Sequence, residues 1–300
     1  MQSTMRNLKA ALIQRAARAD HAADLDDCLE ATRRAAAAGC RLVLLQELHN
    51  GAYFCQRERT GVFEAAEPIP GPSTAALGEI AAALGVVIVG SLFERRAAGV
   101  YHNTAVVLDA DGSLAGVYRK MHIPDDPGYH EKFYFTPGDL GFRPVDTAVG
   151  RLGVLVCWDQ WFPEAARLMA MAGAELLLYP TAIGWDPADD PAERARQREA
   201  WRTVQRGHAV ANGLPLLACN RVGFEPAPDA AGPDDGIQFW GSSFACGPQG
   251  ELLAEASDTA PQDLLVDIDL SRAETVRRIW PFFRDRRIDA YGDLLKRWRD

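Results

Sequence analysis

Three ionisable residues of this chain each stand at the end of an apolar segment. Cys157 follows the run Gly-Val-Leu-Val and precedes a turn into a predicted helix, while Glu47 follows the run over residues 42–46. Lys120 ends a predicted strand and opens a long loop. A thiol beside a helix N-terminus meets backbone N–H groups that favour a thiolate and can bind an oxyanion. Together these residues supply a nucleophile, a general base and a cation, the set that acyl transfer at a carbonyl or nitrile carbon needs.

Taken alone, each of these residues has a plain structural interpretation. A free cysteine is most often a small buried apolar residue, and a charge at a strand end is most often solvated. Catalysis by a cysteine–histidine pair is a second route to a reactive thiol, but no histidine belongs to a signature that includes Cys157. The histidines are His21, His49, His102, His122, His130 and His208. The combination of three strand ends therefore favours a Glu–Lys–Cys arrangement.

Short apolar runs alternate with amphipathic helical stretches along the whole chain. The predicted strands cover residues 8–13, 42–45, 86–92, 104–108, 114–119, 152–156, 176–179, 216–219, 242–246 and 264–268. The predicted helices cover residues 22–38, 74–84, 163–172 and 191–212. This order of elements predicts one α/β domain built on a mixed sheet.

Two segments depart from this alternation. Residues 120–144 form a long loop with many aromatic and charged residues, and loops of this length inside a domain are usually functional. The tail from Arg277 mixes aromatic residues with arginines, a composition common at protein interfaces. The tail either folds back on its own domain or contacts another subunit.

Composition excludes several classes of protein. The 300 residues include 41 acidic and 32 basic ones, and this net charge of −9 argues against nucleic-acid binding. We find no apolar run of membrane-spanning length and no signal-peptide layout, so we expect a cytoplasmic protein without membrane contact. The six cysteines show neither a zinc spacing nor a disulfide framework, and the chain has no phosphate-binding glycine motif. We therefore expect no metal and no cofactor.

Three segments resemble the nitrilase-like carbon–nitrogen hydrolases in order and spacing. They are LLQELHNGAYFCQ, YRKMHIPDDPGYHEKFYFTPGD and GVLVCWDQWFPEAAR. The resemblance extends from Lys9 to about Leu270 and implies a four-layer αββα sandwich. It further implies that Glu47 is the general base, Lys120 the cation beside the oxyanion, and Cys157 the nucleophile.

The resemblance also carries expectations about the substrate. The segments around the long loop are most similar to those of family members that hydrolyse the ureido group of N-carbamoylputrescine. The acidic residues of that loop are expected to bind the ammonium end of this small-molecule substrate, and aromatic residues its carbon chain. The expected substrate-binding residues are Tyr53, Asp125, Asp126, Tyr129, Glu131 and Trp158.

Two other functions stay open on these residues. The same fold can act on an anionic substrate, as a β-ureidopropionase-like or N-carbamoyl amino acid hydrolase, if an arginine binds the carboxylate. A non-catalytic member of the fold would only bind a ligand, although such a protein is expected to lack part of the triad. We expect residues 1–276 to form the hydrolase domain. The C-terminal tail, residues 277–300, is expected at the interface of a homo-oligomer, a dimer or larger.

Overall fold

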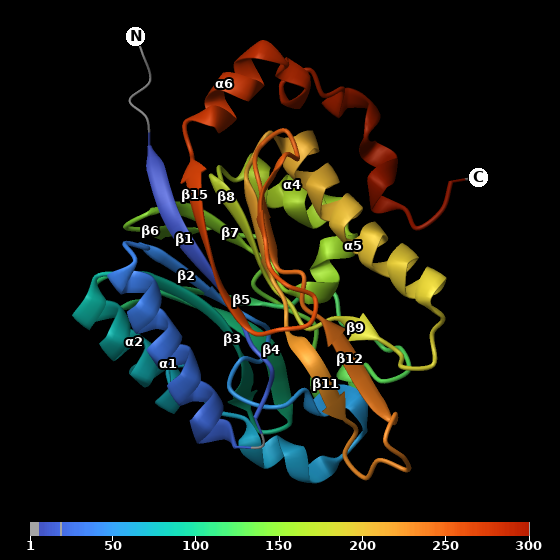
Figure 1. The fold of residues 1–300 in the computed structure, drawn as a ribbon. Coiled ribbons are helices and arrows are strands. Elements are labelled where there is room, and N and C mark those ends of the chain that lie inside the picture. The colour runs from blue at the N-terminus through green and yellow to red at the C-terminus, as the bar shows by residue number, and fades with distance from the viewer. Residues whose placement is uncertain (1–5, 19, 300) are drawn as a thin grey trace.

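Two six-stranded sheets pack face to face and carry helices on their outer sides (Figure 1). The structure, a computed structural model, describes residues 6–18 and 20–299. In the first sheet the strand order is β15 (Gln262–Asp269), β1 (Asn7–Gln14), β2 (Leu42–Leu45), β3 (Val87–Ala97), β4 (Val100–Leu108) and β5 (Leu114–Arg119). In the second it is β14 (Leu252–Glu255), β13 (Phe244–Cys246), β10 (Leu216–Cys219), β8 (Leu176–Pro180), β7 (Gly150–Val154) and β6 (Val145–Thr147).

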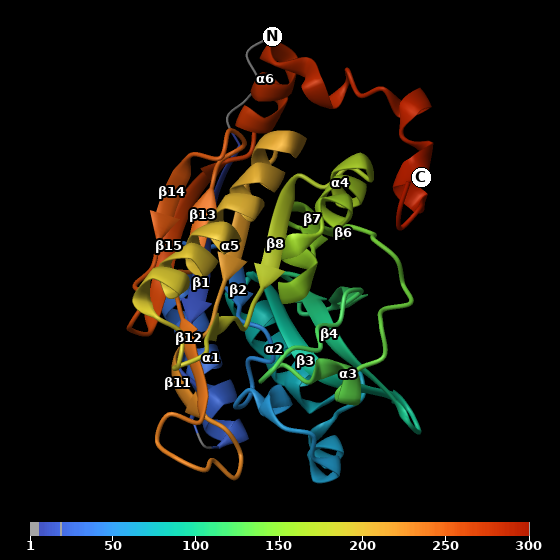
Figure 2. The ribbon, with the colours of Figure 1, turned by 90° about the vertical axis from the view of Figure 1, so that its right-hand side faces the viewer.

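Helices form the two outer layers (Figure 2). Helices α1 (His21–Ala37) and α2 (Pro72–Leu84) cover the first sheet, and α4 (Pro163–Met171) and α5 (Pro191–Asn212) cover the second. The remaining helices are α3 (Glu131–Tyr134) and α6 (Arg272–Ile279). Short 3₁₀ turns cover Phe54–Gln56, Thr60–Ala65, Cys157–Trp161, Pro281–Phe283, Ile288–Ala290 and Gly292–Leu295. The expected four-layer αββα sandwich is confirmed.

The two sheets repeat one topology. Strands β1, β2 and β3 are parallel neighbours joined through α1 and α2, and β4 and β5 then add antiparallel strands. Strands β7, β8 and β10 are likewise parallel and joined through α4 and α5, and β13 and β14 follow as antiparallel strands. The single mixed sheet expected from the strand pattern is therefore wrong: there are two mixed sheets, because the long loop carries the chain from one sheet to the other.

Strand β2 explains why the central strands are apolar throughout. Leu42 and Leu44 belong to the core cluster that contains residues of both sheets. Val43 and Leu45 belong to the cluster that the first sheet forms with α1 and α2. A parallel strand covered on both faces is apolar at every position, in contrast to the alternation of a half-exposed strand.

A third, smaller sheet lies beside the two large ones, and the sequence analysis missed it. It consists of β11 (Val222–Pro226), β12 (Gly236–Trp240) and β9 (Gly184–Trp185) in that order. Its strands are short and contain Gly and Pro, which weaken the sequence signal of a strand.

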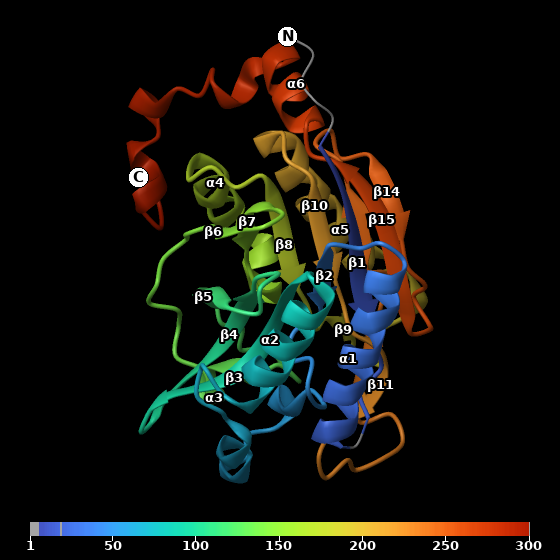
Figure 3. The ribbon, with the colours of Figure 1, turned by 90° about the vertical axis from the view of Figure 1, so that its left-hand side faces the viewer.

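The C-terminal tail arches away from the body of the fold above α4 (Figures 1 and 3). Phe283 anchors it, because the guanidinium groups of Arg167 and Arg277 lie 5.1 and 4.7 Å from the centre of its ring. Beyond this anchor the side chains of Leu295 and Trp298 are 96% and 82% exposed. Within the described part of the chain, the helices are all too short or too polar to span a membrane.

Candidate active site

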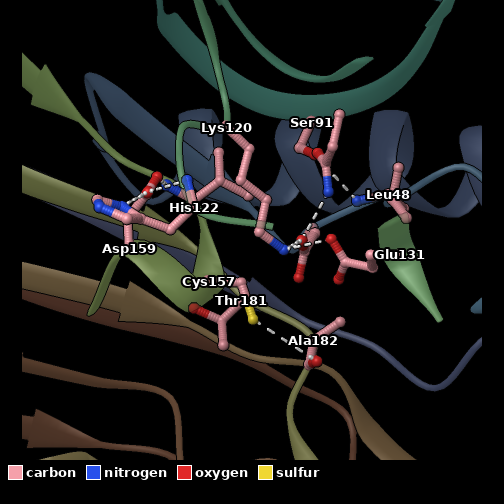
Figure 4. Close-up of polar contacts among 12 residues, drawn as sticks. Leu48, Ser91, Lys120, His122, Glu131, Cys157, Asp159, Thr181 and Ala182 are labelled. Carbon is pink, nitrogen blue, oxygen red and sulfur yellow. Dashed lines mark hydrogen bonds and ion pairs between the residues drawn. The ribbon is translucent and has the colours of Figure 1, made fainter. Parts of the chain in front are cut away.

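The ends of three strands bring the predicted triad together between the two large sheets. Glu47 follows β2, Lys120 follows β5 directly, and Cys157 begins the 3₁₀ turn after β7. The backbone N–H of Glu47 donates to the carbonyl of Thr181, 3.3 Å away, which joins the end of β2 to the end of β8. Figure 4 shows Lys120 pointing toward Glu131, and the sulfur of Cys157 pointing toward the carbonyl of Ala182.

Lys120 lies between two carboxylates and has no contact with solvent. Its Nζ is 2.8 Å from Oε1 of Glu47 and 2.6 Å from Oε2 of Glu131. All three side chains are at least 99% buried. Burial alone would lower the pKa of Lys120, but the carboxylates of Glu131 and Glu47 outweigh it and hold this pKa well above its usual value. Lys120 is therefore a fixed positive charge inside the protein.

Glu131 does not behave as an ordinary carboxylate. Tyr53 donates a hydrogen bond of 2.8 Å to its Oε1, and Lys120 binds the other oxygen. Burial is the main cause that raises the pKa of Glu131 to about 7; the negative charge of Glu47 adds to it, and Lys120 opposes both. One buried cation thus serves two carboxylates, and near neutral pH the second of them carries a proton part of the time.

Cys157 combines a left-handed turn conformation of its backbone with a buried side chain. Its φ is +42°, a left-handed conformation that residues other than glycine rarely adopt. Its Sγ donates to the carbonyl of Ala182 at 3.7 Å. Burial, together with the negative charge of Glu47, raises the pKa of this thiol well above its usual value, although Lys120 opposes the effect. At rest the group is therefore a thiol, and a base would have to remove its proton before the sulfur could act as a nucleophile.

Glu47 has one oxygen available for that task. Its Oε1 accepts from Lys120 and, at 2.7 Å, from Nδ2 of Asn103. In the part of the chain that the structure describes, its Oε2 has no hydrogen-bond partner although it is buried. A buried carboxylate oxygen without a donor is costly to maintain, and it is a strong acceptor for a proton that comes near it.

Residues that the sequence analysis missed hold Glu47 in place. Asn103 is itself fixed by Ser91, whose hydroxyl donates to Oδ1 of Asn103 at 2.7 Å. The fully buried Arg221 donates to the backbone carbonyls of Glu47 and Leu48 at 3.0 and 2.8 Å. Leu48 also has a left-handed φ of +48°, so these bonds stabilise a strained turn. The contacts that Asn103 and Arg221 make with Glu47 and Leu48 join residues more than 50 positions apart, so no local pattern could predict them.

A cavity of about 540 Å³ opens onto the thiol. Cys157 and Glu131 line it, whereas Glu47 and Lys120 lie behind them and are fully buried. Of the residues expected to bind substrate, Asp126, Tyr129, Glu131 and Trp158 line the cavity. The other two do not: Tyr53 is buried behind Glu131, and Asp125 is exposed outside the cavity.

The outer part of the cavity is acidic. Four carboxylates line it here, against one guanidinium, that of Arg196. They belong to Asp126, Asp186, Asp189 and Glu193. Nε of Arg196 donates to Glu193 at 2.9 Å, so this positive charge is already compensated. The sequence analysis missed three of these acids, because acidic residues near the start of a long helix are common as caps.

The described residues contain no group of three or more His, Cys, Asp or Glu side chains arranged to hold a metal ion. The polar groups around Cys157 are instead the ammonium of Lys120, the two glutamates and backbone groups. This set can transfer a proton, stabilise an oxyanion and carry an acyl group on sulfur.

Comparison with known proteins defines the family. The model of the carbon–nitrogen hydrolase family matches residues 9–278, and the chain belongs to this family. It is 48% identical to the N-carbamoylputrescine amidase of Arabidopsis thaliana over 264 residues, which cover 88% of this chain and 87% of the plant protein.

Two further relatives extend over the tail. The citrullinase of Francisella tularensis is 39% identical, with 98% of this chain and 100% of that protein covered. The crystal structure of a carbon–nitrogen hydrolase from Helicobacter pylori superposes with a TM-score of 0.94 at 53% identity, covering 98% of this chain and 100% of that one. The expected membership of the nitrilase-like hydrolases is thereby confirmed.

The raised pKa of Glu131 predicts a pH dependence of stability. A carboxyl group whose pKa rises on folding, here from 4.5 to about 7, stabilises the folded state at low pH. This contribution, on the order of 3 kcal/mol, is lost as the pH rises through about 7. The free energy of unfolding in urea should therefore fall between pH 5 and pH 8 more steeply in the wild type than in Glu131→Gln. Glu64→Gln, at an exposed carboxylate, is the control that should keep the wild-type slope, and an unchanged slope in Glu131→Gln would contradict the assignment.

Proposed function

We propose that this protein hydrolyses N-carbamoylputrescine to putrescine, carbon dioxide and ammonia through a covalent intermediate on Cys157. One observation carries the proposal: a thiol lines an acidic cavity and lies beside a buried Glu–Lys–Glu group. Its similarity to the N-carbamoylputrescine amidase of Arabidopsis thaliana supports this choice of substrate.

In the first half of the reaction, Oε2 of Glu47 takes the thiol proton while Sγ of Cys157 attacks the ureido carbonyl carbon. The carbonyl π electrons move onto oxygen, and Lys120 with a backbone N–H near Trp158 stabilises this oxyanion. When the tetrahedral intermediate collapses, the C–N bond to the terminal amino group breaks and Glu47 returns the proton to the departing ammonia. The product on the enzyme is a thiocarbamate ester of Cys157.

In the second half, a water molecule gives a proton to Glu47 and attacks the thiocarbamate carbon. The C–S bond breaks, the Cys157 sulfur takes the proton back, and the released carbamate loses carbon dioxide to leave putrescine. Because Lys120 is held at 2.8 and 2.6 Å by two carboxylates, its charge is in place before the reaction starts. A preorganised charge of this kind stabilises the transition state without a cost of reorganisation.

The acidic cavity supports a substrate with a positive charge. N-carbamoylputrescine carries an ammonium at the end remote from the ureido group, and removing that charge from water requires a carboxylate partner. Asp126, Asp186, Asp189 and Glu193 lie on the cavity wall, with Trp158 and Tyr129 nearer to the thiol. The aromatic rings suit the four-carbon chain and the carboxylates the ammonium.

Citrulline is the second candidate substrate. It contains the same ureido group but adds a carboxylate beside its ammonium. Arg196 on the cavity wall favours this reading, as does the similarity to the citrullinase of Francisella tularensis over the whole chain. The hydrogen bond from Arg196 to Glu193 weighs against it, because a substrate carboxylate would have to compete with that partner.

We also propose that the C-terminal tail lies at the interface of a homo-oligomer, outside the hydrolase domain of residues 1–276. Half of the large apolar side chains that the described residues expose belong to α6 and the tail. Leu168 and Met171 are further exposed apolar side chains, and they belong to α4, the helix over which the tail arches. A cytoplasmic location fits the six cysteines, all of which are unpaired thiols, since such thiols persist in a reducing compartment.

Removing a member of the triad should abolish turnover without unfolding the protein. Cys157→Ala should release no ammonia, because no other group can form the covalent intermediate. Glu47→Gln and Lys120→Met should each lower kcat by about 10³ or more, as expected for the loss of a base or an oxyanion partner. Cys246→Ala, at a cysteine outside the cavity, is the control that should keep its activity. A near-normal kcat in any of the three triad variants would show that its role is assigned wrongly.

The acidic cavity should select a cationic substrate. A carboxylate partner of a desolvated ammonium is worth a few kcal/mol, so kcat/KM should favour N-carbamoylputrescine over N-carbamoyl-β-alanine by about 10² or more. Asp189→Asn and Glu193→Gln should reduce this ratio. Glu199→Gln should not, because Glu199 lies on α5 like Glu193 but outside the cavity. Equal turnover of both substrates would support the β-ureidopropionase-like alternative, and a preference for citrulline would support the second candidate.

The tail should control assembly. Light scattering should find a dimer or larger species for the full chain, because the exposed apolar side chains of the tail need a partner surface. Deletion of residues 280–300 should lower the order of assembly or make the protein insoluble. A full-length protein that is an active, stable monomer would refute this part of the proposal.

A further inference from the structure

Asp159, two residues after Cys157, is a buried carboxylate that the mechanism above does not use. It has no exposed surface, and its two oxygens accept four hydrogen bonds. Oδ2 accepts from the backbone N–H of Val156 at 2.9 Å and from the hydroxyl of Tyr118 at 2.8 Å. Oδ1 accepts from the backbone N–H of His122 at 3.1 Å and from its ring Nδ1 at 2.7 Å.

These four bonds connect the two segments that carry the thiol and the ammonium. Val156 directly precedes Cys157, while Tyr118 and His122 lie two residues before and two residues after Lys120. Figure 4 shows Asp159 and His122 joined on the side of Lys120 away from Glu131. Asp159 therefore ties the nucleophile's turn to the chain on both sides of Lys120.

The turn that holds Cys157 needs this support. Cys157 starts a 3₁₀ turn with a left-handed φ of +42°, a backbone conformation that strains a residue with a Cβ. Asp159 is the third residue of the turn, and its carboxylate accepts from the N–H of Val156, the residue that precedes the turn. Such a bond satisfies a backbone donor that a helical start leaves without an intrahelical partner.

His122 fixes Asp159 from the other side. Its ring stacks on Phe162 with a centroid distance of 3.7 Å and an angle of 5° between the planes. Because the carboxylate can only accept, the proton on the ring lies on Nδ1. His122 is not among the residues that line the cavity, so it acts through Asp159 and not on the substrate.

We propose that Asp159 and His122 are positioning residues, which hold Cys157 and Lys120 at the separation that the attack on the ureido carbon requires. The inference rests on the proposed roles of Cys157 and Lys120. Position 159 needs a carboxylate because the backbone N–H groups of Val156 and His122 each bind a different one of its two oxygens. An asparagine of the same shape has a single acceptor, so one of these two N–H groups would face an NH₂ donor. A backbone N–H group has a fixed direction and cannot rotate away from an NH₂ group, whereas the hydroxyl of Tyr118 can rotate.

Asp159→Asn is the first test. A displacement of about 1 Å at the reacting groups can cost about 10² in rate, so kcat for N-carbamoylputrescine should fall by this amount or more. KM should change by less than about threefold, because the cavity residues are untouched. Asp24→Asn is the matched control at another buried aspartate: among the described residues its Oδ2 has no partner, so an amide is tolerated there and kcat should stay unchanged.

His122 provides a second test that does not depend on a core substitution, since its side chain is 30% exposed. His122→Asn should keep most of the activity, because its Nδ2 can replace the ring Nδ1 as the donor to Asp159. His122→Ala should lose about tenfold or more in kcat. If the Asn and Ala variants are equally active or equally impaired, the hydrogen bond to Asp159 is not what positions the site.

Alkylation separates this inference from the choice of substrate. The second-order rate of Cys157 modification by iodoacetamide, measured by mass spectrometry of its peptide, should fall about tenfold or more in Asp159→Asn and in His122→Ala. It should stay at the wild-type value in His122→Asn. A wild-type protein that does not turn over N-carbamoylputrescine would refute the proposed function, while these alkylation rates would still decide the role of Asp159. Unchanged rates in all variants would overturn the inference.

Discussion

The ion pair of Lys120 with two glutamates is the constraint on which the rest of this site depends. One ammonium is buried with Glu47 and Glu131, so the group has more negative than positive charge in a region without solvent. Burying charge is costly unless hydrogen bonds and partners compensate it. Burial, to which the negative charge of Glu47 adds, raises the pKa of Glu131 to about 7 and holds the pKa of the Cys157 thiol well above its usual value, while Lys120 opposes both shifts. In the proposed mechanism, Glu47 is the carboxylate that accepts the proton of the thiol.

The surrounding fold supplies the compensation. Asn103, Arg221 and Asp159 each come from a different part of the chain, and each uses hydrogen bonds to fix one member of the site. Arg221 and Asp159 bind backbone groups just beyond strand ends, where the regular ladder of a sheet stops and donors and acceptors need other partners. The strand ends that bring the triad residues together thus also leave backbone groups free to bind the residues that hold the triad in place.

The sequence alone predicted that Glu47, Lys120 and Cys157 meet at one site, but it did not predict the cavity. Glu47, Lys120 and Cys157 are conspicuous because each interrupts or ends an apolar run, and three matching segments fixed the family. The acids Asp186, Asp189 and Glu193 lie between β9 and the first turn of α5, and they reach the cavity only because these two elements place them there. Asp125 and Asp126 were both expected to bind the substrate as acidic residues of the long loop. Asp126 lines the cavity, whereas Asp125 lies outside it. The separation into two sheets was equally hidden, since strand patterns do not state which strands pair.

The repeated topology of the two sheets has a consequence for how activity arises. Glu47 and Lys120 come from the first repeat and Cys157 from the second, so neither half of the chain contains a complete site. During synthesis, the first repeat, β1 to β5, has been translated before the ribosome reaches Cys157. A chain that has folded only one repeat exposes no activated thiol to the other small molecules of the cell. Catalysis in this architecture is therefore a property of the joined halves, and turnover reports directly that both have folded and docked.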